Sequence, residues 1–100
     1  MKKKIIKTSN NDYENATIFI AKEWLKRVKA KKLIQFDYVN IATKKEAKEN
    51  ELLSDTKENK KYYIDISGSI FGFDDEIELV NIINELDIFM YLAGQLRYIK

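Results

Sequence analysis

The sequence predicts a small α+β domain in which an antiparallel sheet carries two helices packed on one face. Two stretches, from Asn11 to about Lys32 and from Asp74 onwards, have apolar residues at helical spacing. Residues 33–42 and 61–73 alternate as strands do, and the polar stretch 43–60 separates them. The order helix, strand, connection, strand, helix makes the two strands antiparallel neighbours.

Composition limits the size of the protein and its chemistry. One hundred residues provide for a single domain, 1–100, with one hydrophobic core. The chain has no histidine, cysteine or proline, which removes nucleophile–histidine pairs, disulfides and Cys/His zinc sites. We therefore expect a protein that is not an enzyme, with no catalytic residues, no metal, no cofactor and no small-molecule substrate.

Charge is unevenly distributed along the chain. Residues 1–50 hold 13 basic and 6 acidic residues, a net charge of +7, whereas residues 51–100 hold 5 and 10, a net charge of −5. This asymmetry either steers a partner or lets the two halves attract each other within one fold. Lys, Ile, Asn, Tyr and Phe make up 49 of the 100 residues. Their A/T-rich codons fit an AT-rich bacterium, or a phage or mobile element of one.

The N-terminus has a basic start but no signal sequence. Only Ile5 and Ile6 follow Met1–Lys4 before the chain becomes polar again. The longest apolar run, residues 88–93, is far shorter than the ~20 residues that span a bilayer. These features predict a cytoplasmic protein with no membrane partner.

The first elements are expected in the following order. Residues 3–8 form a short edge strand, whose lysines deter edge pairing. Asn11 then caps a helix with Glu14 three residues on, a capping-box pattern. The apolar face of this helix consists of Tyr13, Ala16, Thr17, Ile20, Ala21, Trp24, Leu25 and Val28.

The middle of the chain is expected to hold the two strands. The alternation in residues 33–42 changes phase near Tyr38, which indicates a bulge. Residues 43–60 form a mobile hairpin connection or a short solvated helix. Residues 61–73 form one strand, in which Gly68 and Gly72 let another element approach closely.

The last third begins with a helix capped by Asp75 and Glu78. After Asp87 the apolar residues change face, so two alternatives stay open. Either one long helix has a second apolar face, or the chain turns at Asp87 and residues 88–99 form a strand or hairpin around Gly94. If residues 88–99 and Ile5–Ile6 join the sheet, the fold is instead a ferredoxin-like βαββαβ arrangement.

The polar face of the first helix is a candidate nucleic-acid surface. It combines lysines, which bind phosphates, with one aromatic residue that can stack on a base. The alternative is that lysine is abundant everywhere and that a loop covers the aromatic ring. The candidate residues are Phe19, Lys22, Lys26, Arg27 and Lys29.

The C-terminal segment is a candidate protein-binding surface, because it carries more apolar residues than one small core needs. The alternative is that the segment is buried in the protein's own core. The candidate anchoring residues are Ile88, Tyr91, Leu92, Leu96, Arg97 and Ile99. Acidic residues that would steer the encounter are Asp74, Asp75, Glu76 and Glu78.

These observations favour a non-enzymatic module that binds a protein partner or a second copy of itself. One concrete form is a small inhibitor, immunity or anti-defence factor of a phage or mobile element that occludes its partner. The alternative is a nucleic-acid-binding protein that uses the basic helix.

Overall fold

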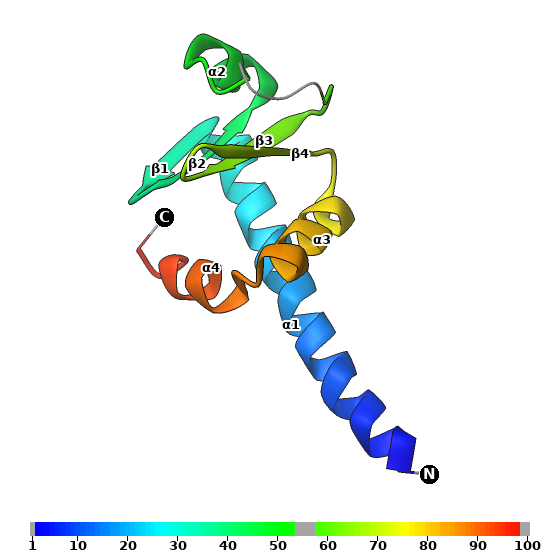
Figure 1. The fold of residues 1–100 in the computed structure, drawn as a ribbon. Helices are drawn as coiled ribbons and strands as arrows, with labels where there is room; N and C mark the ends of the chain where they lie inside the picture. Colours follow the sequence, from blue (N-terminus) through cyan, green and yellow to red (C-terminus); the bar gives the residue numbers. More distant parts are fainter. Residues whose placement is uncertain (1, 54–57, 99–100) are drawn as a thin grey trace.

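A four-stranded antiparallel sheet forms the centre of the fold. The computed structural model describes residues 2–53 and 58–98. The strands lie in the order β1-β2-β3-β4, and every neighbouring pair is antiparallel (Figure 1). Their bounds are β1 Leu33–Phe36, β2 Val39–Thr43, β3 Tyr62–Ile66 and β4 Ser69–Phe73.

Helices cover both faces of this sheet, unequally. Helices α1 (Lys2–Lys31), α3 (Glu76–Leu86) and α4 (Phe89–Gln95) lie on one face, and the short α2 (Lys44–Glu49) lies on the other (Figure 1). The predicted α+β class is therefore confirmed, with α1 and α3 as the two main helices. The N-terminal turns of α1 extend beyond the rest of the domain (Figure 1). With α1 included, the longest dimension is 52 Å.

The core lies between the sheet and the three helices. Alternate residues of each strand face it, as the pleat of a strand requires. Its largest fully buried side chains include Trp24, Ile41, Ile64, Phe73, Leu79, Ile83 and Leu92. A smaller cluster under α2 consists of Ala42, Ala47 and Tyr63. Both clusters use the faces that strand alternation assigns to them.

Two predicted single strands are in fact hairpins. Phe36 pairs with Val39, so Asp37 and Tyr38 form a two-residue loop, with Asp37 at φ 48°. The predicted bulge near Tyr38 is wrong, because residues i and i+3 across such a loop share a face and imitate a phase slip.

The prediction of one strand over residues 61–73 fails for the same reason. Ile66 pairs with Ser69 across Ser67 and Gly68, which both have positive φ angles of 52° and 94°. Gly68 is therefore a turn residue, and a β-carbon added there would meet nothing within 4 Å. Gly72 does have the predicted close neighbour, because a β-carbon there would lie 2.5 Å from Cγ of Lys60.

The N-terminal predictions are wrong. Residues 3–8 are helical rather than a strand, and Asn11 is inside α1 instead of capping it. The polar residues at positions 9–12 include neither glycine nor proline, so nothing there stops a helix. Extending an existing helix also costs far less than starting one. Once the buried part of α1 is formed, the helix can continue back to Lys2.

The connection between β2 and β3 contains the short helix that was one of the two alternatives. The side chain of Thr43 accepts a hydrogen bond from the Glu46 N–H and so begins α2. Ala47 of this helix is buried against the sheet. The predicted connection also includes residues 54–57, which lie outside the described part of the chain.

The end of the chain combines parts of both alternatives. Asp75 caps α3, as predicted, by accepting the Glu78 N–H at 3.0 Å. The chain turns at Asp87, which has a left-handed conformation, but a second helix follows instead of a strand. Gly94 lies within this helix. The ferredoxin-like alternative is therefore wrong, since neither end of the described chain joins the sheet.

Candidate functional site

The outer face of α1 carries the residues expected to bind nucleic acid. The opposite face, including Trp24, is buried in the core. Phe19 is 58% exposed, a high value for a phenylalanine. Lys22, Lys26 and Lys29 are exposed on the same side, because steps of three and four residues return to one face of a helix. The helix thus presents an aromatic ring followed by three ammonium groups.

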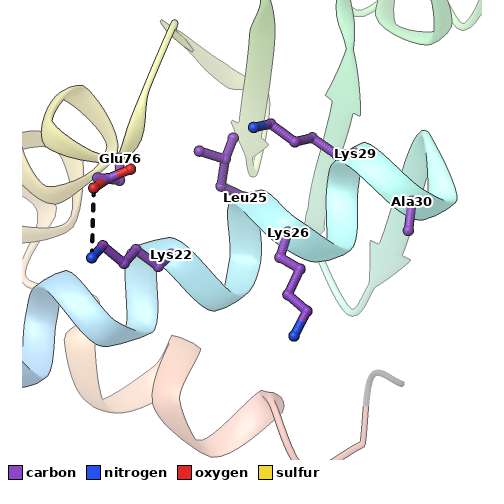
Figure 2. A pocket seen from close by; sticks show the side chains of 6 residues that line it. All are labelled: Lys22, Leu25, Lys26, Lys29, Ala30 and Glu76. Atoms are coloured by element: carbon purple, nitrogen blue, oxygen red, sulfur yellow. Dashed lines mark ion pairs between the residues drawn. The ribbon is translucent and has the colours of Figure 1, made fainter.

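A shallow groove of about 470 Å³ runs along these lysines. It lies where the start of α3 meets α1, and Figure 2 shows the lysines spreading in different directions from it. Its apolar lining comes from Leu25 and Ala30. The residues that line it are Lys22, Leu25, Lys26, Lys29, Ala30 and Glu76.

Glu76 is the carboxylate in this groove. Its Oε2 lies 3.9 Å from Nζ of Lys22 (Figure 2). The side chains of both residues are more than one third exposed. An exposed ion pair of this kind contributes only about 0–1 kcal/mol. Lys26 and Lys29 make no ion pair with a carboxylate among the described residues, so the groove has a net positive charge.

Arg27 differs from the lysines because it already has a partner on its own helix. Its Nη1 donates a hydrogen bond to Oε1 of Glu23 at 2.6 Å, one turn earlier. This hydrogen bond lowers the pKa of Glu23 from its ordinary value. Arg27 therefore lies at the edge of the basic face and in an ion pair.

The four predicted steering acids have structural partners within the fold. Asp75 and Glu78 cap the start of α3, where Glu78 also accepts the Asp74 N–H at 2.8 Å. Asp74 accepts the Lys61 N–H at 2.9 Å. Of these four acids, only Glu76 joins the acidic half of the chain to the basic half, through its ion pair with Lys22 of α1. Attraction between the two halves is thus present within one fold.

Lys60, which also lies in residues 51–100, pairs with two of the same acids. Its Nζ lies 3.2 Å from Glu78 and 3.9 Å from Asp74. The hydrogen bond to Glu78 raises the pKa of Lys60 above its ordinary value. Two of the acids expected to steer a partner are therefore already paired with a cation.

The C-terminal residues expected to anchor a partner are distributed between core and surface. Leu92 is buried, with 1% of its surface exposed. Ile88 and Leu96 are partly buried and pack against the same core. Arg97 is exposed, and Ile99 lies outside the described residues. The apolar stripe of this segment is thus mainly the inner face of α4.

Tyr91 forms a polar contact that ties α4 to the β1–β2 loop. Its hydroxyl donates a hydrogen bond to Oδ2 of Asp37 at 2.7 Å, and its ring stacks on Tyr38 with centroids 5.7 Å apart. Burial, together with the nearby Asp37 carboxylate, raises the pKa of Tyr91 to about 12.

Sequence reasoning missed a separate apolar surface beside α4. Met90 is 79% exposed, and Tyr13 of α1 contacts the ring of Phe89 with centroids 5.2 Å apart. The uninterrupted apolar run 88–93 could have indicated this surface, because a helix cannot bury all of its residues on one side. In a helix, Met90 and Leu92 point in nearly opposite directions, so burying one exposes the other.

Neither a metal site nor a membrane span is present in the part of the chain that the structure describes. No three acidic side chains there are arranged so that they could hold a metal ion. Each helix in that part is too short or too polar to pass through a bilayer.

Comparison with protein-family models, curated proteins and solved structures found no match to this chain.

Proposed function

We propose that the protein is a non-enzymatic binding module of the cytoplasm that binds single-stranded nucleic acid through the outer face of α1. The main support for this proposal is the exposure of Phe19. Its side chain is 58% exposed and lies on the same helix face as Lys22, Lys26 and Lys29. Proteins that bind single strands combine a positively charged groove with exposed aromatic rings. All four residues lie on one rigid helix, so binding requires no rearrangement to bring them together.

Each part of this surface has a separate role in the proposal. The ammonium groups of Lys26 and Lys29 bind phosphates and release the counterions that surround them. The ring of Phe19 stacks on a base, which a single strand presents and a duplex does not. Lys22 exchanges its exposed, weak ion pair with Glu76 for a phosphate. Recognition of this kind tolerates many base sequences.

Fluorescence anisotropy with labelled oligonucleotides tests the proposal. We expect Phe19→Ala to weaken the binding of a single strand by about tenfold, since stacking on one base contributes about 1–3 kcal/mol. Tyr38→Ala is the matched control, because Tyr38 is 55% exposed but lies in the β1–β2 loop, where its ring stacks on Tyr91 of α4, and is not part of α1. It should leave the affinity unchanged.

The salt dependence of the affinity tests the lysines. Lys26→Gln/Lys29→Gln should reduce the slope of log affinity against log salt by about 1.4, which is the effect of losing two phosphate contacts on a single strand. Absence of binding at low salt would contradict the proposal. Equal binding of poly-glutamate would show that the surface recognises an acidic protein instead.

A protein partner is the second candidate, and the apolar surface of Tyr13, Phe89 and Met90 favours it. Tyr13 and Met90 are exposed, and the Tyr13 ring contacts the partly buried Phe89. Exposed apolar surface is typical of protein interfaces. Under this proposal the protein occludes its partner, as a small inhibitor or immunity factor of a phage or mobile element would.

A further inference from the structure

Lysines from three segments of the chain converge at one end of the sheet. Thr43 and Tyr62 are the last paired residues of β2 and β3. Just beyond them, the Lys44 N–H donates to the carbonyl oxygen of Lys61 at 2.9 Å. The Thr43 N–H donates to the carbonyl oxygen of Lys32 at 2.9 Å. Backbone hydrogen bonds thus hold the end of α1, the start of α2 and the start of β3 together.

A second groove, of about 630 Å³, opens at this end. Its volume is larger than that of the groove on α1, and most of the residues that line it are also polar or basic. The residues that line it are Thr43, Lys44, Lys45, Asn59, Lys60, Lys61, Tyr62 and Asp74.

Of the four lysines that line this groove, three form no ion pair with a carboxylate of the described residues. Lys60 is paired with Asp74 and Glu78. Lys44 donates only to the uncharged Oδ1 of Asn59, at 2.5 Å. Among the described residues, no carboxylate forms an ion pair with Lys44, Lys45 or Lys61.

Asp74, the one carboxylate lining the groove, is largely satisfied within the fold. Lys60 lies 3.9 Å away, and the Lys61 N–H donates to it at 2.9 Å. An approaching phosphate would therefore meet a net positive charge.

We infer that this second groove binds further phosphates of the nucleic-acid strand that α1 holds, and so extends the binding site to the sheet. The inference rests on the proposed function. Phe19 and Lys32 are separated by 13 residues, which is about 20 Å along a helix. Lys29 lines the first groove, and the exposed Lys32 follows three residues later, where its carbonyl oxygen accepts the N–H of Thr43 of the second groove. A short strand would occupy α1 alone, whereas a longer one would reach Lys44 and Lys45.

Oligonucleotides of two lengths test this inference. Labelled single strands of about 4 and about 16 nucleotides are titrated with the full-length protein and with Lys44→Gln/Lys45→Gln. Glutamine at position 44 can still donate to Asn59, so the fold is retained. We expect the variant to bind the long strand about tenfold more weakly, with a salt slope reduced by about 1.4, and to bind the short strand as the wild type does.

The matched control is Lys48→Gln/Arg97→Gln, which removes the same charge. Both residues are exposed, and neither lines the groove. This control should leave the binding of both strands almost unchanged. An equal loss for both double variants would mean that net charge alone causes it, which would overturn the inference.

The other outcomes separate this inference from the function on which it rests. If Lys44→Gln/Lys45→Gln binds the long strand as the wild type does, while Lys26→Gln/Lys29→Gln weakens it, the second groove is not part of the site. An equal loss with both lengths would also overturn the extension along the strand. If the wild type binds neither strand, the proposed function itself is wrong.

Discussion

The indole nitrogen of Trp24 donates a hydrogen bond to the carbonyl oxygen of Leu92 at 3.2 Å, and both residues are buried. The contact joins α1 to α4 across 68 positions of the chain. A buried indole N–H needs an acceptor, so this bond and the surrounding packing together hold α4 in place. The segment expected to anchor a partner is therefore attached to the centre of the core.

Two substitutions in α4 should change stability by very different amounts. Leu92→Ala removes a buried side chain and should lower the free energy of unfolding by about 2–5 kcal/mol. Met90→Ala, at a position 79% exposed, should change it by less than about 0.5 kcal/mol. Urea unfolding followed by the fluorescence of Trp24 measures both values. Equal effects would mean that α4 does not pack as described.

The two main helices could be predicted from the sequence because their buried faces are regular. The expected stripe that includes Ala21, Trp24 and Val28 is the buried face of α1. The cap formed by Asp75 and Glu78 could also be predicted, since it depends only on local spacing. The same helix geometry put Phe19 and the lysines on the outer face.

The hairpins could not be separated from single strands by alternation alone. The loop Asp37–Tyr38 contains no glycine, and Asp37 itself takes the positive φ angle at which glycine is most common. The burial of Leu92 could not be predicted either, because it depends on packing against Trp24, which is 68 positions away in the sequence. The second groove depended on strand register, which brings Lys44 beside Lys61.

Alanine at two glycine positions should have effects of opposite sign. At Gly72 a β-carbon would meet Cγ and Cβ of Lys60 at 2.5 and 2.9 Å. Those atoms are close to the backbone and cannot move easily, so Gly72→Ala should destabilise the protein by about 1–3 kcal/mol. At Gly94, within α4, a β-carbon meets nothing within 4 Å. Gly94→Ala should stabilise the protein by about 0.5 kcal/mol. Thermal unfolding of both variants gives the two signs.

Substitutions of Asp75 can separate capping from steering. Asp75→Ala removes the acceptor of the Glu78 N–H and should cost about 1 kcal/mol. Asp75→Asn removes the charge but keeps an oxygen that can cap, so its stability should stay within a few tenths of a kcal/mol of the wild type. Urea unfolding measures the stabilities. Stopped-flow mixing with the protein partner of the second candidate function measures the rate of association. A slower association of Asp75→Asn at unchanged stability would support steering by this acid.

Burial of Tyr91, together with its hydrogen bond to Asp37, should make stability depend on pH in the alkaline range. The pKa of Tyr91 is about 12 in the folded protein, against an ordinary value of about 10. The folded state thus keeps a proton that the unfolded state loses first. The contribution to stability is complete below pH 10 and is lost as the pH rises from about 10 to about 12.

Tyr91→Phe should remove this pH dependence, because phenylalanine does not titrate. Denaturant unfolding at several alkaline pH values measures it, and ultraviolet absorbance of tyrosinate follows the titration directly. A wild-type titration in which all tyrosines ionise near pH 10 would contradict the assignment. So would a Tyr91→Phe variant that loses stability over the same range as the wild type.

The protein-binding candidate predicts that charge at Tyr13 and Met90 abolishes binding without unfolding the domain. Both side chains are about half exposed or more, so Tyr13→Lys/Met90→Lys should keep the urea midpoint of the wild type. Tyr38→Lys/Ile77→Lys is the control, since it adds the same charge at two other exposed apolar positions.

Affinity capture from the native host should retain a partner with the wild type and with the control, and should lose that partner with Tyr13→Lys/Met90→Lys. Light scattering identifies a second copy as that partner if the wild-type mass exceeds 11.8 kDa and the variant returns to that value. Retention of the same partner by Tyr13→Lys/Met90→Lys would exclude this surface and leave the lysine face of α1 as the binding site.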